Sequence, residues 1–455
     1  MTALGMIDAG FLLAETARQP MHVGGLTLLD PPRGVSARRV ADDALGSLLA
    51  HADAAPPFNQ RATWRMGLWR WEPDRDFDIA RHVRRLTLPS PGTDATLRAT
   101  VAQLHGEALA RDHPLWQLYV IDGLASGQLA VYGKIHHALA DGVTALRWWA
   151  RATSRQPTVQ PAPFWTRAVP ARPAARGGWS MAGAALRPFA RNGRRRLLMG
   201  AVRSVAHVGA EMARSWYAHG TDNDYVSFSQ APRTLFNRRI GATRSFATAS
   251  FALAEMTAAA RRCGVTLNDL ALELCADALR HYLIERGELP DAPLIAMVPL
   301  SLRGAAATPG NRVAMTLANL GTHLARPRSR LEVIHRSMAD GKQRARRLSP
   351  AELMTYLGMQ MSPHGLNLAL GLDPGWQAFN LIVSNVPGPR GPRYWGAARI
   401  AAQYPLSIVI DGAALNITLN SFGERLDFGL TACPVVVPDL DALAGHIHGA
   451  LDPFR

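Results

Sequence analysis

Residues 118–152 have the sequence LYVIDGLASGQLAVYGKIHHALADGVTALRWWARA. Apolar and β-branched residues fill 118–124 and 129–136, and the short Ala-Ser-Gly loop between them is typical of a hairpin, so both segments are predicted to be strands. The following segment, 143–152, is predicted to be a helix. The heptapeptide His136–Gly142 (HHALADG) therefore lies where a strand ends and a helix begins, a position at which loops often carry function.

The residue types of this heptapeptide suit proton transfer. An imidazole can take a proton from a hydroxyl near neutral pH, so His136 and His137 are candidate bases, although a core or capping role for one of them is the alternative. Asp141 can fix the loop, and Gly142 can let the chain turn. His and Asp are also metal ligands, but adjacent strand residues point to opposite faces and rarely share one ion. We therefore expect no metal here.

The composition excludes several classes of protein. The chain has 455 residues, of which 48% are apolar and 19% charged, so it can form two or three domains with a sizeable core and is not disordered as a whole. The three cysteines, Cys263, Cys275 and Cys433, are too few and too scattered for a disulfide framework or a thiolate zinc site, and they suit a reducing cytosol. No apolar run reaches 18 residues and no basic leader begins the chain, so neither a membrane-spanning helix nor a secretory signal is expected.

The positive charge is concentrated in one segment. The net charge is +15, and the sixteen Arg and three acidic residues between Arg151 and Arg244 account for +13 of it. This clustering, without a reader motif, argues against nucleic-acid binding. Arginines alternate with apolar residues at near-helical spacing: Leu198, Val202, Val205, Val208 and Met212. An amphipathic helix or helix pair over residues 185–216 is therefore predicted to bind an anionic membrane surface, unless its apolar stripe packs on the protein's own core.

The chain divides into three parts: an N-terminal domain over 1–150, a basic Pro/Arg-rich linker with helices over 151–243, and a C-terminal domain over 244–455. Pro-rich residues 157–173 are expected to form an exposed linker. The third part is predicted to have strands at 294–300, 381–385, 406–410, 414–421 and 426–432, and helices at 267–287 and 439–451. Strands and helices in both halves indicate a mixed α/β fold.

HHALADG matches the HHxxxDG signature of the CoA-dependent acyltransferase superfamily, and further motifs narrow this resemblance. These motifs are PMHVGG at 20–25, PLW at 114–116, Asn268-Asp269, PLSLR at 299–303, Gly310-Asn311, SNVPGP at 384–389 and ALNITLNS at 414–421. Together they make nearly the whole chain resemble the bacterial wax ester synthase/acyl-CoA:diacylglycerol acyltransferase family.

The resemblance implies an α/β fold of two domains, each like a chloramphenicol acetyltransferase subunit, with mixed sheets and a tunnel between them. It implies transfer of a long-chain acyl group from acyl-CoA to diacylglycerol or a long-chain alcohol, which gives triacylglycerol or wax ester and free CoA. We expect no cofactor, since acyl-CoA is a substrate, and a peripheral location at the inner face of the cell membrane or at a lipid-droplet surface.

The resemblance also assigns roles. It makes His137 the general base, with no acyl-enzyme, while His136 supports the geometry, Asp141 holds the loop and Gly142 allows close packing. Ser384 and Asn385 are candidate oxyanion donors, although turn chemistry would also explain Asn385. Asn268 is a weaker candidate, because it could simply cap a helix.

Some features leave alternatives open. Thr144 and Arg393 depart from the family pattern, which commonly has Ser and Leu there. Trp116, Trp148 and Trp149 could contact lipid, but core packing is the simpler interpretation. Lys134 could contact a CoA phosphate or be solvated. Other hypotheses are a superfamily acyltransferase that acts on an amine or polyketide acceptor, and a non-catalytic lipid-binding relative.

Overall fold

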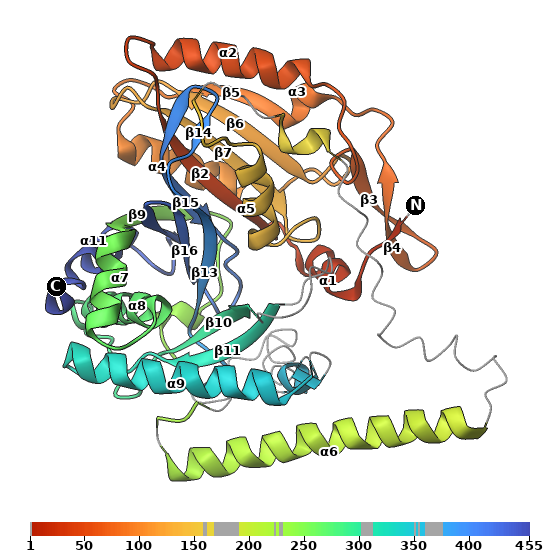
Figure 1. The fold of residues 1–455 in the computed structure, drawn as a ribbon, viewed down its shortest axis with the longest axis vertical. Helices are drawn as coiled ribbons and strands as arrows, with labels where there is room; N and C mark the ends of the chain where they lie inside the picture. The colour runs from red at the N-terminus through yellow and green to blue at the C-terminus, as the bar shows by residue number, and fades with distance from the viewer. Residues whose placement is uncertain are drawn as a thin grey trace. The chain divides into compact units, whose positions relative to one another are not determined.

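The computed structural model describes most of the chain, namely residues 2–157, 162–167, 191–222, 224–226, 231–301, 313–349, 352–353, 355–359 and 376–455. The chain forms two compact units (Figure 1). The first contains Met1–Ala171, Thr234–Leu289 and Leu381–Arg455, and the second contains Arg172–Arg233 and Pro290–Asn380. The division of the sequence at residues 150 and 243 stays a prediction.

The first unit is built on a six-stranded sheet in the order β14-β15-β2-β7-β6-β5. Its strands are β2 (His22–Asp30), β5 (Val83–Thr87), β6 (Trp116–Asp122), β7 (Leu129–His136), β14 (Tyr394–Trp395) and β15 (Ala398–Leu406). β6 and β7 form the expected antiparallel hairpin. β15 comes from the C-terminal part of the sequence and pairs antiparallel with β2, so distant segments share this sheet.

Alternating residues of β6 face two different cores. Leu118 and Val120 pack with Leu48 of α2 (Ala37–Ala50) in one cluster. Tyr119 and Ile121 belong to a second cluster, with α4 (Asp94–Gly106). Because successive side chains of a strand point to opposite faces, the two helices cover opposite faces of the sheet. This part also contains β1 (Thr2–Ala3), α1 (Met6–Ala14), β3 (Gln60–Arg65), β4 (Leu68–Pro73), α3 (Ile79–His82), α5 (Gly142–Arg151) and η1 (Phe164–Thr166).

The first unit contains a second group of strands in the order β13-β16-β17-β9. These are β9 (Ser245–Ala252), β13 (Leu381–Arg390), β16 (Leu415–Gly423) and β17 (Arg425–Ala432). β13 runs parallel to β16, and the other neighbours are antiparallel. The accompanying helices are η3 (Leu235–Asn237), α7 (Leu253–Arg262), α8 (Leu267–Ile284), α11 (Leu440–Gly449) and η4 (Asp452–Phe454).

Polar contacts between β15 and β17 join the two strand groups of the first unit. The buried Asp427 carboxylate on β17 accepts hydrogen bonds from the Gln403 backbone N–H of β15 at 2.8 Å and from the Ser250 hydroxyl at 2.5 Å. Burial raises the pKa of Asp427, although these hydrogen bonds act in the opposite direction. β15 and β17 also approach closely at Gly429, where an added Cβ would lie 1.7 Å from the Pro405 carbonyl oxygen.

The second unit contains the antiparallel pair β10 (Ile295–Ser301) and β11 (Val313–Asn319) and a short pair, β8 (Ala231–Pro232) and β12 (Trp376–Gln377). Its helices include α6 (Arg191–Thr221) and α9 (Pro327–Arg347). α9 packs against β11 at Gly341, where an added Cβ would lie 2.1 Å from Oγ1 of Thr316. No helix within the described ranges is long and apolar enough to cross a membrane.

The mixed α/β class is confirmed, and most expected elements lie within a few residues of their predicted positions. The strand expected at 406–410 is wrong, because β15 ends at Leu406. The exposed linker expected at 157–173 lies partly outside the described residues, but Trp165 within it is buried and stacks on Trp116 at 5.2 Å between ring centroids. Trp116 and Trp148 are core residues, as expected. The three cysteines are free.

We predict that Gly429→Ala destabilises the protein by about 2 kcal/mol or more, because neither backbone can yield without breaking strand pairing. Thermal unfolding monitored by circular dichroism measures this effect. Gly445→Ala is the matched control: Gly445 lies in α11 with open space around its Cα, so alanine should stabilise the helix by about 0.5–1 kcal/mol. An unchanged melting temperature for Gly429→Ala would contradict the close contact between β15 and β17.

Candidate active site

The turn between β7 and α5 brings HHALADG together. His136 ends β7, and Asp141 is the N-cap of α5, where its Oδ1 accepts a hydrogen bond from the backbone N–H of Thr144 at 2.7 Å. This bond satisfies one of the N–H groups that a helix leaves open at its first turn. The sequence suggested that Gly142 lets the chain turn, but Gly142 does not adopt a left-handed conformation. An added Cβ at this position would make an ordinary contact, 3.9 Å from Val386.

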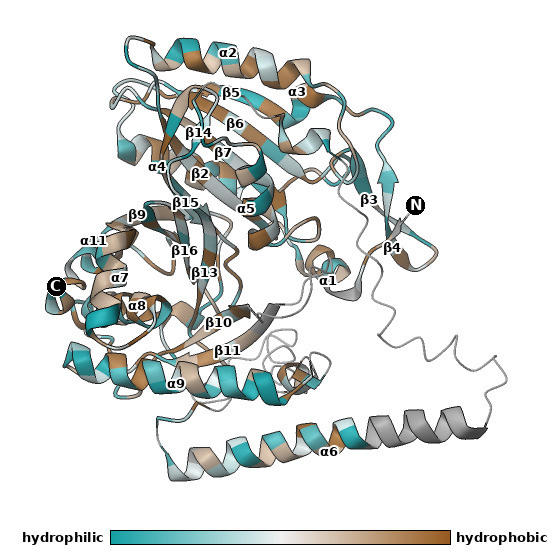
Figure 2. Ribbon diagram, in the orientation of Figure 1, coloured by the Kyte–Doolittle hydropathy of each residue, from teal (hydrophilic) through white to brown (hydrophobic). Residues whose placement is uncertain are grey.

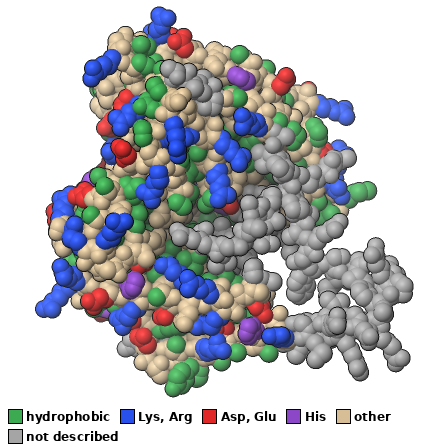
Figure 3. All heavy atoms as spheres, in the orientation of Figure 1, with side chains coloured by type: hydrophobic (Ala, Val, Ile, Leu, Met, Phe, Trp, Pro, Cys, Tyr) green, Lys and Arg blue, Asp and Glu red, His purple; other side chains and the backbone are tan. Residues whose placement is uncertain are grey.

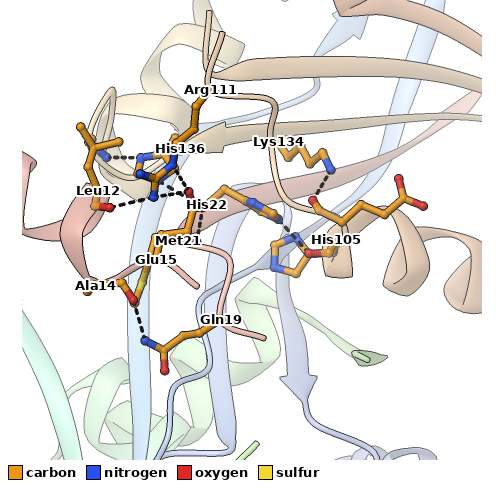
Figure 4. A network of polar contacts seen from close by, with 12 residues as sticks. Leu12, Ala14, Glu15, Gln19, Met21, His22, His105, Arg111, Lys134 and His136 are labelled. Carbon is orange, nitrogen blue, oxygen red and sulfur yellow. Dashed lines mark hydrogen bonds and ion pairs between the residues drawn. The ribbon is translucent and has the colours of Figure 1, made fainter. Parts of the chain in front are cut away.

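His136 is fully buried and held at both ring nitrogens. Its Nδ1 accepts a hydrogen bond from the backbone N–H of Ala138 at 3.1 Å, and its Nε2 lies 3.4 Å from Oε1 of Glu15 (Figure 4). Oε2 of Glu15 accepts two hydrogen bonds from Arg111, at 3.0 and 2.9 Å. His136 therefore has a structural environment rather than one open to a substrate.

His137 is only partly buried, and the N-terminal segment holds it in place. Its ring stacks on that of Phe11 in α1, with the centroids 4.0 Å apart and the planes inclined by 20°. Its backbone N–H donates to the carbonyl oxygen of Met21 at 2.8 Å. The two imidazoles thus have different surroundings, and His137 is the less buried of the two residues.

A buried polar group lies beside this pair. His22 is paired with His136 across β2 and β7, and its Nε2 contacts the backbone oxygen of His105 at 2.8 Å. Burial lowers the pKa of His105 to about 3, so its ring is neutral. Both expectations for Lys134 are wrong: its ammonium is buried and donates to the carbonyl oxygens of Leu104 and Glu107 at 2.6 and 2.7 Å, at the end of α4. Burial lowers the pKa of Lys134 to about 8.

The three candidate oxyanion residues belong to two neighbouring elements. Ser384 and Asn385 lie on β13, and Nδ2 of Asn385 donates to Oδ1 of Asn268 at 3.3 Å. Asn268 does not cap α8, because Thr266 is the N-cap and forms a capping box with Asp269. Since Gly142 contacts Val386, β13 lies beside the HHALADG turn. The backbone and amide groups of β13 are therefore close to the start of α5.

Arg393, which departs from the family pattern, binds the C-terminal end of α5. Its guanidinium donates to the carbonyl oxygens of Ala150 and Thr153 and to the Thr153 hydroxyl, the Thr153 contacts being 2.6–3.0 Å long. Carbonyl groups at a helix C-terminus have no partner within the helix, and a cation stabilises them. Arg393 thus caps the helix that Asp141 begins.

Sequence reasoning missed Phe11, Glu15 and Arg111, which contact the histidine pair or its partner. The available signal was weak: an acidic residue five positions before the PMHVGG motif. A metal centre finds no support within the described part of the chain, where no three His, Cys, Asp or Glu side chains are grouped to hold an ion.

Comparison with known proteins decides the family. The model of the wax ester synthase/diacylglycerol acyltransferase catalytic domain matches residues 4–271, and the model of the C-terminal domain of the same family matches residues 309–454. The chain belongs to this family. The O-acyltransferase WSD of Acinetobacter baylyi is 38% identical over 462 residues, which cover 100% of this chain and 97% of the relative. A probable diacylglycerol O-acyltransferase of Mycobacterium tuberculosis is also 38% identical, over 98% of this chain and 96% of the relative.

Solved structures agree with this assignment to the wax ester synthase/diacylglycerol acyltransferase family. The wax ester synthase/diacylglycerol acyltransferase of Marinobacter aquaeolei has a TM-score of 0.78 and 33% identity, with 100% of this chain and 98% of that one covered. The starter condensation domain of rhizomide synthetase has a TM-score of 0.53 and 17% identity, covering 100% of this chain and 94% of that domain, which shows a shared fold alone. The resemblance found in the sequence motifs is confirmed, and the chain is an acyltransferase.

We predict that Asp141→Ala lowers both thermal stability, by about 1 kcal/mol, and acyl transfer, because the N-cap bond to Thr144 is lost. Asp141→Asn should restore most of both, since asparagine caps helices about as well as aspartate. Melting temperature and initial rate measured on the same preparations test this. A stable but inactive Asp141→Asn variant would show that the carboxylate takes part in the chemistry.

Proposed function

We propose that this protein transfers a long-chain acyl group from acyl-CoA to the hydroxyl of diacylglycerol or of a long-chain alcohol, with His137 as general base. The observation that carries the proposal is the position of His137, a partly buried residue whose ring is held by α1 at the HHALADG turn of a chain with full-length similarity to an O-acyltransferase. The products are an ester, triacylglycerol or wax ester, and free CoA.

The reaction consists of one proton cycle. His137 takes the proton of the acceptor hydroxyl as its oxygen attacks the thioester carbonyl, and a tetrahedral oxyanion forms. When the intermediate collapses, the C–S bond breaks and the histidine returns the proton to the CoA thiolate. Acyl-CoA is a substrate, and the cycle requires no cofactor. It also requires no acyl-enzyme: Cys275 and Cys433 are buried, and burial raises the pKa of the Cys275 thiol.

The donors on β13 are suited to stabilise the oxyanion. A primary amide has two N–H donors, so Asn385 can bind Asn268 with one and the oxyanion with the other. Ser384 precedes it on the same strand. In this proposal Asn268 orients the Asn385 amide and does not touch the substrate.

We predict that His137→Ala lowers turnover by about 10²–10⁴-fold, the usual contribution of a positioned general base. The assay combines purified protein and labelled palmitoyl-CoA with either hexadecanol or dioleoylglycerol, and measures ester and free CoA. His136→Gln is the comparison variant, since His136 is buried and should act only through geometry. If His137→Ala keeps most of the activity while His136→Gln loses it, the roles are reversed.

The proposal places the enzyme at a membrane or lipid-droplet surface on the cytoplasmic side, because both acceptors are too apolar to arrive through water. The positive charge of residues 151–244 and the exposed apolar residues of α6 support this location. On the face drawn in Figure 3, Lys and Arg side chains are spread widely, with fewer Asp and Glu among them, in keeping with the net charge of +15.

The described part of α6 has a polar inner face and an apolar outer face. Glu211 is 1% exposed and accepts hydrogen bonds from Arg347 at 2.8 and 3.2 Å, and the buried Ser215 hydroxyl lies 2.9 Å from that of Tyr356. Val208 is also buried. On the adjacent side of the helix Val205, Met212 and Trp216 are 72%, 39% and 78% exposed; α6 is labelled in Figure 2.

Of the apolar stripe expected from the sequence, Val208 is buried whereas Val205 and Met212 are exposed, and the side chains of Leu198 and Val202 lie outside the described part of the structure. The first residues of the predicted segment, 185–190, lie outside the described part of the chain. The exposed Arg203 and Arg214 lie on the same helix but on the side away from these apolar residues, and Arg214 also contacts Glu211 at 3.2 Å. Apolar residues accompanied by arginine are what an anionic lipid surface binds.

We predict that Arg203→Gln with Arg214→Gln weakens binding to phosphatidylserine-containing vesicles by about tenfold or more, since each basic residue near an anionic surface contributes about 1 kcal/mol. Trp216→Ala should weaken it further, and high salt should act like the arginine changes. Vesicle co-sedimentation measures binding, and Val435→Ala, a change at an equally exposed apolar residue outside α6, is the control. Vesicle binding that is unchanged by high salt and by every α6 variant would contradict the proposed surface.

A further inference from the structure

The carboxylate of Glu15 lies at the junction of the contacts that hold the histidine pair. Its Oε1 lies 3.4 Å from Nε2 of His136 and accepts the backbone N–H of Met21 at 3.1 Å. Its Oε2 is bound by Arg111, whose guanidinium also donates to the carbonyl oxygen of Leu12 at 2.7 Å. The Glu15 side chain is 5% exposed and that of Arg111 is 40% exposed, so the carboxylate is the buried partner of this ion pair.

These contacts fix the tautomer of His136. Its Nδ1 accepts a backbone N–H, so this nitrogen carries a lone pair, and the proton of the neutral ring is on Nε2. This nitrogen lies 3.4 Å from Oε1 of Glu15, within ion-pair distance. A histidine bound in this way has no free nitrogen with which to accept a substrate proton.

The same carboxylate also reaches His137, through the peptide groups of Met21. Glu15 binds the N–H of Met21, and the carbonyl oxygen of Met21 accepts the N–H of His137 at 2.8 Å. Glu15 directly follows α1, and that helix provides the Phe11 ring on which His137 stacks. Displacement of Glu15 would therefore disturb both the backbone and the ring contacts of the base.

Glu15 is ionised in this setting. Its burial acts to raise its pKa, but the hydrogen bonds from His136, Met21 and Arg111 outweigh burial, and the pKa lies below its usual value. Asp141 is not an alternative orienting carboxylate, because its Oδ1 caps α5. Glu15 is the carboxylate that lies beside the His136 ring.

We propose that Glu15, held by Arg111, is the positioning carboxylate of this active site: it sets the tautomer of His136 and, through Met21 and α1, places the His137 imidazole for proton transfer. Glu15 is a positioning residue and does not touch the substrate. The inference rests on the proposed function only in taking His137 as the base.

The test compares Glu15→Gln and Glu15→Leu with the wild-type enzyme. Glutamine keeps one oxygen beside the Met21 N–H and the His136 Nε2 but loses the charge, so kcat should fall about tenfold. Leucine loses both the oxygen and the charge, and kcat should fall about 10²-fold, the effect of a base misplaced by about 1 Å. KM for palmitoyl-CoA should stay within about twofold in both variants, because Glu15 acts on the base and not on substrate binding.

Asp122→Asn is the matched control. Asp122 is as buried as Glu15, with 3% of its side chain exposed, and it is paired with Arg85 at 2.5 Å in the same unit. This change should lower the melting temperature and leave kcat within about twofold. An equal loss of kcat in Asp122→Asn would show that any broken buried ion pair harms turnover, and this would overturn the proposal, as would Glu15 variants that keep more than half of the wild-type kcat.

A second measurement does not depend on turnover. In protein labelled at histidine, the Cε1–H resonance of His137, identified by its loss in His137→Gln, is shielded by the Phe11 ring. It should move in Glu15→Leu towards its position in Phe11→Leu, and stay in place in Asp122→Asn. An unchanged resonance in Glu15→Leu would overturn the inference. If the wild-type protein forms no ester at all, the proposed function fails, and this resonance alone decides the role of Glu15.

Discussion

The register of β2 against β7 is the constraint on which the site depends. It sets His22 opposite His136 and continues beyond β7, where the carbonyl oxygen of Met21 accepts the N–H of His137. A shift by one residue would exchange the two faces of the strand and remove every side-chain contact of the pair. The sheet core enforces this register, since alternate residues of the neighbouring strand β6 are buried on both faces. Packing of the sheet and placement of His137 therefore depend on the same register.

Local pattern was enough to predict the elements around the motif. β7 has the predicted bounds, and α5 begins one residue before the predicted helix, because both are determined by nearby residues: an apolar run, an N-cap and a helical composition. The strand predicted at 406–410 failed for a long-range reason. β15 starts at Ala398 and pairs with β2, almost 400 residues away in sequence, and polar residues of this strand, such as Gln403, are buried through contacts that no local pattern reveals.

The site was only half predictable for the same reason. His136, His137 and Asp141 form one short motif, whereas Glu15 and Arg111 are separated from each other by 96 residues and meet only in the folded chain. Lys134 illustrates the opposite error. A lysine two residues from the histidine pair suggested a phosphate ligand, but its neighbours along β7 are all core residues, and the ammonium instead binds the open carbonyl groups at the end of α4. Charge in a sequence indicates function only when the fold leaves it accessible.

The helix α6 shows how a buried charge can decide which face of a helix is exposed. The periodicity of the sequence predicted an amphipathic helix, and all residues of its apolar stripe were expected to share one environment. Glu211 determines the outcome, because a carboxylate in the interior needs cationic partners, and Arg347 together with Arg344 on α9 provides them. With Glu211 buried, Val205 and Trp216 on other sides of the helix are exposed, at 72% and 78%. The side of α6 that is buried is thus fixed by an internal charge and its partners on α9, which the apolar periodicity of the sequence does not contain.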